Sequence, residues 1–302
     1  MSDHATQATL IYRHRLPVRI MHWINVVALS ILFMSGLAIF NAHPALYWGS
    51  SSYTGRPAVL EIGIPNTEDA PPMWRGVLRI GEYEFNTTGF LGISTREGRL
   101  NTVAFPAWLT IPTYYSLAEA RDWHFLFAWI FVINGLCFLA YSIGSGHVRR
   151  DLWPTRADIA GIPASIRDHL LFRHPRGEAA RRYNVLQKLA YLVVIFILLP
   201  LVVLMGMAMS PGLNALLTGW VDLFGGRQSA RTIHFIVAWL LVAFVFIHVF
   251  EVIVSGVWNH LRSMITGYFR IDPEPAKAET RAGNASAHAD PATSDAATGE
   301  KK

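Results

Sequence analysis

Residues 231–250, RTIHFIVAWLLVAFVFIHVF, decide the fold of this chain. They form one long apolar run, with His234 near its start and His248 near its end. A helix that crosses a bilayer needs about 20 mostly apolar residues, and ionisable side chains inside a bilayer are costly and rare. The stretch therefore predicts a membrane-spanning helix, and each of its two histidines requires an explanation.

Three other stretches have a similar length and apolar character. The four predicted spans cover about 20–40, 123–143, 186–207 and 233–257. The first span could be taken for a signal peptide, but its apolar run is too long for a signal core and no convincing cleavage site follows it. The chain is 52% hydrophobic and only 16% charged, whereas soluble domains carry about 25% charged residues. We therefore expect an all-α membrane protein, a four-transmembrane-helix bundle.

The arginines indicate how the bundle is oriented, since basic residues favour the cytoplasmic side. The connection at about 144–182 carries eight arginines, whereas those of the loop at about 41–120 are fewer and diluted by acidic residues. Both termini are therefore expected in the cytoplasm of a bacterium, with the chain in its inner membrane and the loop outside. Membrane topology explains the net charge of +5 better than nucleic-acid binding does.

The segments outside the spans carry further expectations. The outer loop, about 41–120, is too long for a plain connector, and it is expected to dock a partner, to cap the bundle, or both. The inner connection should contain a helix on the membrane surface, because apolar residues recur there at helical spacing. These residues are Ile159, Ile162, Ile166, Leu170 and Leu171. The transmembrane domain is expected to cover 1–265, and 266–302 to form a disordered cytoplasmic tail.

Four histidines lie within the predicted spans, and their depths pair them. His22 comes early in a span that starts inside, and His124 comes early in a span that starts outside. In the fourth span, the 14-residue separation of His234 and His248 corresponds to about 21 Å of helix, with both side chains within about 40° of one direction. His124 is therefore expected to oppose His234 at the outer level, and His22 to oppose His248 at the inner level.

Paired histidines on facing helices can supply both axial ligands of a haem iron. Any one of them alone is more simply read as a hydrogen-bonded core histidine, but the layered set of four favours haem. A zinc site would need more ligands close together. The chain has one cysteine, Cys137, and no Cys-x-x-Cys-His motif for covalent attachment, so two non-covalent b-type haems are predicted.

Glycines and arginines are candidates for the surroundings of the haems. Gly36 and Gly135 could let a flat ring approach the helix backbones, or could mark close helix packing. Propionates need cationic partners. The candidates are Arg227 and Arg231 for the outer haem and Arg15 and Arg19 for the inner one, and each could equally be an anchor at the membrane interface.

The spans resemble those of bacterial di-haem cytochrome b subunits, found in nickel–iron hydrogenases, formate dehydrogenase-N and thiosulfate reductase. The matching stretches are RIMHWINVVALSILFMSGL at 19–37, RDWHFLFAWIFVINGL at 121–136, RYNVLQKLAY at 182–191 and ARTIHFIVAWLLVAFVFIHV at 230–249. The long outer loop and GGRQSARTIH at 225–234 look more like the thiosulfate-reductase type. The resemblance implies the same four histidine ligands that depth predicts.

The resemblance implies electron transfer between a quinone and a periplasmic redox partner, which for this type is often a molybdopterin oxidoreductase. Alternatively, this chain could be a cytochrome b subunit of the hydrogenase type. A stand-alone haem oxidoreductase acting on superoxide or ferric iron is a second class of function, and a haem-free anchor or transporter subunit is a third. The long outer loop argues for a protein partner over the stand-alone enzyme.

Three polar residues near the inner haem are candidates for quinone binding. Asn184 and Gln187 are three apart at the start of the third span, where the related family uses polar residues for this purpose. They could hydrogen-bond a quinone carbonyl, or they could cap the helix. Glu251 follows His248 by three positions. It could exchange protons with the quinone, or form a structural hydrogen bond or a salt bridge to Arg262 or a loop arginine.

Overall fold

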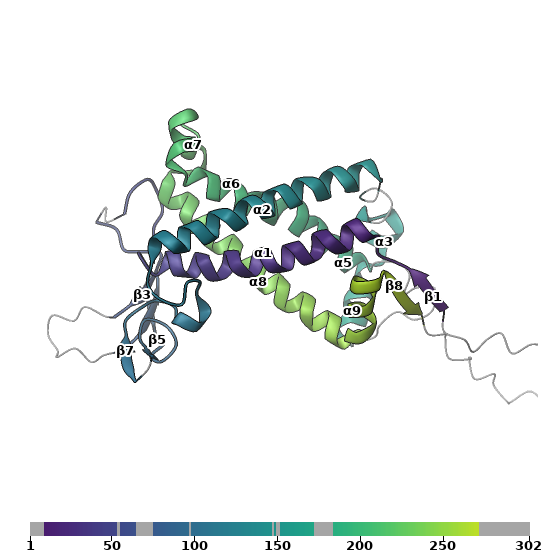
Figure 1. Ribbon diagram of the computed structural model, residues 1–302, viewed down its shortest axis with the longest axis horizontal. Helices are drawn as coiled ribbons and strands as arrows, with labels where there is room; N and C mark the ends of the chain where they lie inside the picture. Colours follow the sequence, from purple (N-terminus) through teal and green to yellow (C-terminus); the bar gives the residue numbers. More distant parts are fainter. Residues whose placement is uncertain are drawn as a thin grey trace, which may run out of the picture.

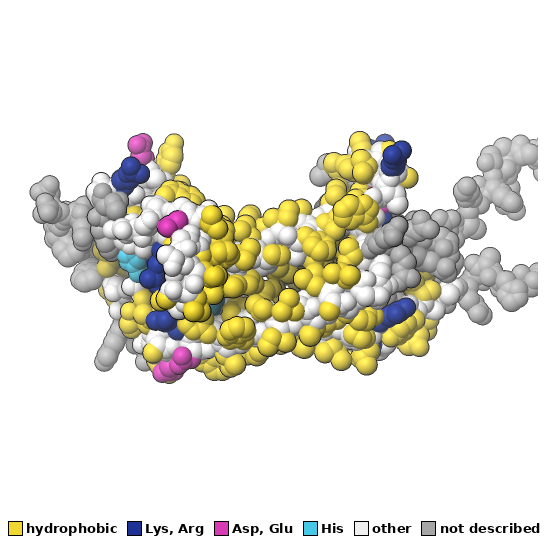
Figure 2. All heavy atoms as spheres, turned by 90° about the horizontal axis from the view of Figure 1, so that it is seen from above, with side chains coloured by type: hydrophobic (Ala, Val, Ile, Leu, Met, Phe, Trp, Pro, Cys, Tyr) yellow, Lys and Arg dark blue, Asp and Glu magenta, His cyan; other side chains and the backbone are white. Residues whose placement is uncertain are grey.

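Four long helical spans run along an elongated molecule (Figure 1). The computed structural model describes residues 9–52, 55–64, 75–96, 98–146, 148, 152–171 and 184–271. The spans are α1 (Leu16–Phe40), α2 (Leu117–Gly144), Val185–Ala208 and α8 (Arg227–Val254), and each is long and apolar enough to cross a membrane. Figure 2 shows a hydrophobic middle with the charged side chains gathered toward the two ends. The predicted four-helix membrane fold is confirmed.

The third span is not a continuous α-helix. It consists of α5 (Val185–Val193), a π-helical turn (Val194–Leu198) and α6 (Leu199–Ala208). Pro200 follows directly in α6, and a proline inside a helix lacks an N–H donor and clashes with the carbonyl four residues earlier. The wider π turn just before Pro200 accommodates this residue without ending the span.

Local signals place the helix ends a few residues away from the predicted ones. The Ser116 side chain accepts from the backbone N–H of Glu119, so α2 begins at Leu117, well before the predicted start at 123. At the other end of the chain, α8 stops at Val254, and Gly256 in a left-handed conformation (φ 104°) separates it from α9 (Val257–Thr266). The fourth span is therefore three residues shorter at its end than the predicted 257.

The long loop between α1 and α2 folds into small antiparallel sheets, which the sequence analysis did not assign. One sheet has the order β2 (Ala45–Leu46), β3 (Leu60–Gly63), β4 (Val77–Ile80) and β5 (Tyr83–Asn86), and β6 (Ser94–Arg96) pairs with β7 (Arg99–Asn101). A 3-10 turn covers Ala107–Leu109. We call these strands and their connections the loop domain.

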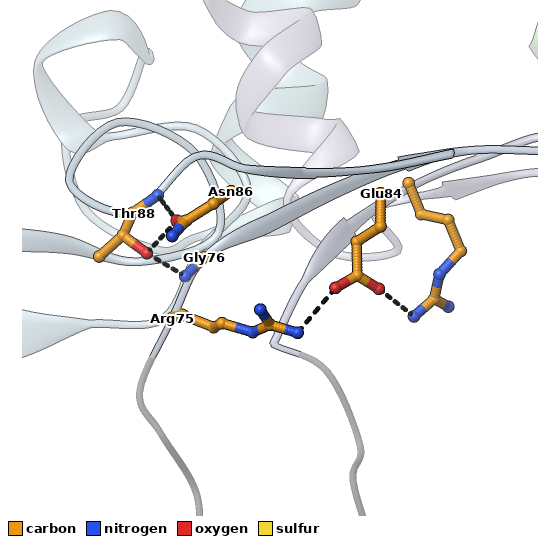
Figure 3. Close-up of polar contacts among 6 residues, drawn as sticks. Arg75, Gly76, Glu84, Asn86 and Thr88 are labelled. Carbon is orange, nitrogen blue, oxygen red and sulfur yellow. Dashed lines mark hydrogen bonds and ion pairs between the residues drawn. The ribbon is translucent and has the colours of Figure 1, made fainter. Parts of the chain in front are cut away.

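The loop domain packs on the end of α1 and is braced by polar contacts. Leu37 and Phe40 of α1 share a buried cluster with residues of the loop domain, namely Leu46, Ile62, Ala104 and Phe105. Figure 3 shows Glu84 pairing with Arg75 at 2.8 Å and with Arg79 at 3.3 Å. The loop therefore caps this end of the bundle, which is one of the two roles expected for it.

The opposite end of the molecule carries the two ends of the described chain. β1 (Thr9–Tyr12) pairs antiparallel with β8 (Tyr268–Ile271). β8 therefore lies within the predicted tail of 266–302, and residues 272–302 of that tail lie outside the described part of the chain. The pairing holds the start of α1 close to the end of α9.

Short helices complete the fold. The predicted surface helix of the inner connection is split into α3 (Arg156–Ala160) and α4 (Ile162–Leu170), with Gly161 between them. Ile159, Ile166 and Leu171 are exposed, as an interfacial helix requires. Residues 172–183, which include several of the arginines of this connection, lie outside the described residues. The link from α6 to α8 holds α7 (Pro211–Leu216) and a 3-10 turn at Val221–Phe224.

Candidate functional site: two histidine pairs

The structure brings the four span histidines together as two pairs. The ring centroids of His124 and His234 lie 6.3 Å apart, and those of His22 and His248 lie 6.4 Å apart. Two imidazoles on opposite sides of one metal ion, each with a bond of about 2 Å, have centroids separated by roughly 6 Å. Both pairs thus have the spacing that two axial ligands of one iron require.

The pairs lie at different positions along α8. His124 of α2 and His234 lie toward the loop domain, and we call them the loop-side pair. His22 of α1 and His248 lie toward β1 and β8, and we call them the terminal-side pair (Figure 1). These are the same pairs that depth along the spans predicts. Among the described residues, no three His, Cys, Asp or Glu side chains gather as a metal-ion site, so the donor set suits a haem iron rather than zinc.

Both rings of the loop-side pair are hydrogen-bonded through Nδ1. Nδ1 of His234 lies 2.8 Å from the backbone oxygen of Val202 in α6. Nδ1 of His124 lies 3.1 Å from Oγ of Ser35 in α1, a fully buried residue. Because a carbonyl oxygen only accepts, Nδ1 of His234 carries the proton, which leaves its Nε2 free to bind a metal.

The terminal-side rings are held differently. Within the part of the chain that the structure describes, neither ring of this pair has a hydrogen-bond partner. The His248 ring stacks on Phe244 at 5.9 Å between centroids, and the His22 ring meets Trp23 edge-on at 5.6 Å. The backbone beside His22 is fixed by buried Asn134 of α2. Its Nδ2 donates to the Met21 oxygen at 2.9 Å and to Oδ1 of Asn25 at 2.7 Å.

Small residues make room for the rings. A Cβ added at Gly36 would lie 3.5 Å from Cε1 of His124, and one added at Gly206 would lie 3.5 Å from Cε1 of His234. The flat ring beside Gly36 is therefore the imidazole of His124. A Cβ at Gly135 would meet nothing within 4 Å. Contact of Gly36 or Gly135 with a haem stays a prediction.

The four candidate arginines are in different situations. Arg231 donates from both terminal nitrogens to backbone oxygens of the loop domain, those of His43 and Ala45, so it joins α8 to this domain. Arg19 donates to the Ile265 oxygen at 2.7 Å and joins α1 to α9. Arg15 and Arg227 are exposed. Two of the four thus have a structural role already, while propionate binding stays a prediction for all of them.

The quinone candidates Asn184 and Gln187 form a capping box. Oδ1 of Asn184 accepts from the backbone N–H of Leu186 at 3.1 Å, and Oε1 of Gln187 accepts from the backbone N–H of Asn184 at 3.3 Å. Asn184 is therefore the N-cap of α5, so the two residues cap the helix, which is one of the two roles that the sequence allowed. Because the cap uses their oxygens, their amide NH₂ groups remain the donors that a quinone carbonyl would need.

Lys188 is a charged residue of this region that the sequence analysis missed. It is buried in α5 and pairs with Asp158 of α3 at 2.8 Å. The hydrogen bond from Lys188, with further bonds from Thr155, lowers the pKa of Asp158 to about 2. The pair fixes α3 against the start of the third span. Glu251 is half-buried on α8, and Arg262, one of its expected partners, donates to Oδ1 of Asn259 at 2.8 Å.

Comparison with known proteins identifies the family. A profile described as prokaryotic cytochrome b561 matches residues 13–267, which include all four spans and both histidine pairs. The chain belongs to this family. It is therefore a membrane cytochrome of the b type, a family that binds b-type haem, and the predicted cytochrome b relationship is confirmed.

Two relatives show the same relationship. The chain is 28% identical over 251 residues to a putative protein-methionine-sulfoxide reductase subunit, YedZ1, of Azospira oryzae, covering 83% of this chain and 94% of the relative. It is 23% identical over 282 residues to a probable Ni/Fe-hydrogenase B-type cytochrome subunit of Cupriavidus necator, covering 88% and 89%. No solved structure matches the chain. Since neither relative is a thiosulfate-reductase subunit, that closer likeness stays a prediction.

Proposed function

We propose that this cytochrome b561 holds two b-type haems and carries electrons between a quinone and a periplasmic oxidoreductase. The observation that carries the proposal is the presence of two histidine pairs, at 6.3 and 6.4 Å, at different levels of one bundle. Haem, when bound, supplies reversible one-electron chemistry. The histidines would hold the two irons at successive positions along α8, which supports passage of electrons from one membrane side to the other.

The orientation that we propose places both termini in the cytoplasm and the loop domain in the periplasm of a bacterial inner membrane. The arginine-rich connection between α2 and α5 supports this orientation. The loop-side pair would then be the outer one and the terminal-side pair the inner one. A partner would exchange electrons at the loop side, and a quinone at the terminal side.

The loop domain is the surface that we propose for the partner. Four of its aromatic side chains are exposed, those of Tyr83, Phe85, Phe90 and Trp108. They accompany the charged network of Arg75, Arg79 and Glu84 (Figure 3), and exposed aromatics with arginines are typical of interfaces. Both relatives are named as subunits of redox enzymes, a reductase and a hydrogenase, which supports a redox partner for this chain. We propose that the partner is a molybdopterin oxidoreductase, because the long outer loop resembles that of the thiosulfate-reductase type.

The quinone is proposed to bind near the start of α5. The NH₂ groups of Asn184 and Gln187 would donate to its carbonyl oxygens. Glu251, on the turn of α8 that follows His248, would exchange protons with it.

Haem content and quinol reduction test the function together. The purified full chain should contain two haems by pyridine haemochrome analysis, and a soluble quinol analogue should reduce both in a stopped-flow measurement. His22→Ala should retain only the loop-side haem and lose fast reduction by quinol. His234→Ala should retain only the terminal-side haem and remain reducible, because electrons enter there.

The same variants identify the way in which the proposal could fail. One haem per chain would contradict the two-site arrangement. Two haems that a quinol cannot reduce would leave the cytochrome intact but remove the quinone from its function. If His22→Ala kept fast quinol reduction while His234→Ala lost it, the quinone site would lie at the loop side instead. Asn184→Leu and Gln187→Leu then separate quinone binding from haem binding, since each should slow reduction with normal spectra.

A further inference from the structure

Ser35 is placed to control the electronic state of one histidine. It lies one position before Gly36 on α1, is fully buried, and has its Oγ 3.1 Å from Nδ1 of His124. We propose that Ser35 is a positioning residue that fixes the tautomer of His124 and thereby lowers the reduction potential of the loop-side haem. This inference rests on the proposed function, because it assumes a haem at that pair.

The direction of the hydrogen bond follows from the number of protons. A serine hydroxyl has one proton to donate, and Oγ of Ser35 lies 2.7 Å from the Ile31 oxygen, closer than to the histidine. The hydroxyl proton therefore goes to Ile31, and Oγ accepts from Nδ1–H of His124. This contact requires the proton on Nδ1 of His124, which leaves the Nε2 lone pair for the iron.

The bond has a consequence for redox chemistry. An acceptor at the outer N–H of a metal-bound imidazole makes that imidazole a stronger electron donor. Stronger donation stabilises ferric over ferrous iron, which lowers the reduction potential. The donation of Ser35 to Ile31 polarises its oxygen and strengthens it as an acceptor. Since Ser35 is 0% exposed, water does not compete for the bond.

The partner ligand has the same arrangement by a different route. Nδ1–H of His234 donates to the Val202 carbonyl, a backbone group that no substitution removes. Ser35 is therefore the side chain through which this effect can be tested in the loop-side pair. The terminal-side rings have no hydrogen bond of this kind among the described residues, so the terminal-side haem should not respond to a change at position 35.

The experiment is a potentiometric titration of the haem absorbance in the full chain in detergent. Ser35→Ala removes the acceptor that faces His124 and adds no bulk. Ser30→Ala is the matched control. Ser30 lies on the same helix, and its hydroxyl donates to the backbone oxygen of Val26, four residues earlier, at 2.7 Å. Unlike Ser35, it has no hydrogen bond to a histidine among the described residues. Ser35→Ala should change the ratio of oxidised to reduced loop-side haem at fixed potential about three- to ten-fold, a rise of roughly 30 to 60 mV at 59 mV per decade.

Each outcome has a defined meaning. A rise in one component, with the second component and Ser30→Ala unchanged, supports the proposal. An unchanged or lowered potential overturns it, since the hydroxyl would then have no effect or would donate to the ring. Loss of one haem in Ser35→Ala alone also overturns it, because the hydroxyl would then hold the haem rather than tune it. A wild-type chain with fewer than two haems would instead contradict the proposed function, which the haem count shows before any titration.

Discussion

The loop-side and terminal-side pairs have nearly the same ring spacing, 6.3 and 6.4 Å, but are held in different ways. On the loop side, Nδ1 of each ring is itself hydrogen-bonded, that of His124 to Oγ of Ser35 and that of His234 to the Val202 oxygen, which accepts. On the terminal side, Asn134 fixes the α1 backbone next to His22, and Phe244 and Trp23 contact the rings. A bundle can therefore place a ligand either by binding its ring or by fixing the helix that carries it. The first way also influences the electronic state of the ring, and the second does not.

The largest expected effect is at Gly206, which contacts the His234 ring. Gly206→Leu should abolish the loop-side haem and leave the terminal-side haem, because the larger side chain would occupy the position of the imidazole. Gly206→Ala is the control: its Cβ would lie at an ordinary contact distance of 3.5 Å from Cε1, so it should retain both haems. Haem content and the spectra of both variants measure this. Equal loss of both haems in Gly206→Leu would mean that the two pairs are not independent.

A smaller effect, on the terminal side, is expected for Asn134→Leu. The change removes a buried hydrogen-bond donor, so Oδ1 of Asn25 loses its partner. The loss should lower the free energy of unfolding by about 1–3 kcal/mol. Because Asn134 binds the backbone beside His22, the terminal-side haem should be released at a lower temperature than in the wild type, ahead of the loop-side haem. Thermal release followed by absorbance would show this order. Simultaneous release of both haems would indicate that Asn134 stabilises the whole bundle instead.

The smallest effect concerns the Asp158–Lys188 pair. Lys188 lowers the pKa of Asp158 from 3.8 to about 2, so the folded state favours the ionised carboxylate. Its contribution to stability is therefore present above about pH 4 and is lost as the pH falls toward 2. Asp158→Asn should lower the melting temperature at pH 6 by a few degrees at most, and this difference should shrink below pH 4 and become small at about pH 2. A difference that stays constant with pH would mean that the charge of Asp158 is not involved.

Much of this arrangement could be predicted from the sequence. Apolar length gives the four spans, and the depth of each histidine gives the two pairs without any distance information. The helix ends, by contrast, depend on Ser116 and Gly256, and the strands of the loop domain are only two to four residues long. Such short strands do not show a clear alternating pattern.

The surroundings of the rings were harder to predict for a physical reason. Ser35 meets His124 from another helix, 89 positions away in the chain, and no local pattern reports such a contact. Gly206 is likewise recognised only when its neighbour His234 is known. For Asn184 and Gln187, a spacing of three suits both a shared helix face and a capping box. The structure has the capping box.

The position of α8 in the chain links haem binding to the order of synthesis. This helix is the last of the four spans to leave the ribosome, and it supplies one histidine to each pair. The first described strand, β1, also waits for the last one, β8, before it can pair. A nascent chain or a fragment that ends before α8 therefore contains half of each ligand pair and a complete version of neither. Both pairs are completed only after α8 has been synthesised, so a chain that stops before this helix cannot hold haem between two histidines in this way.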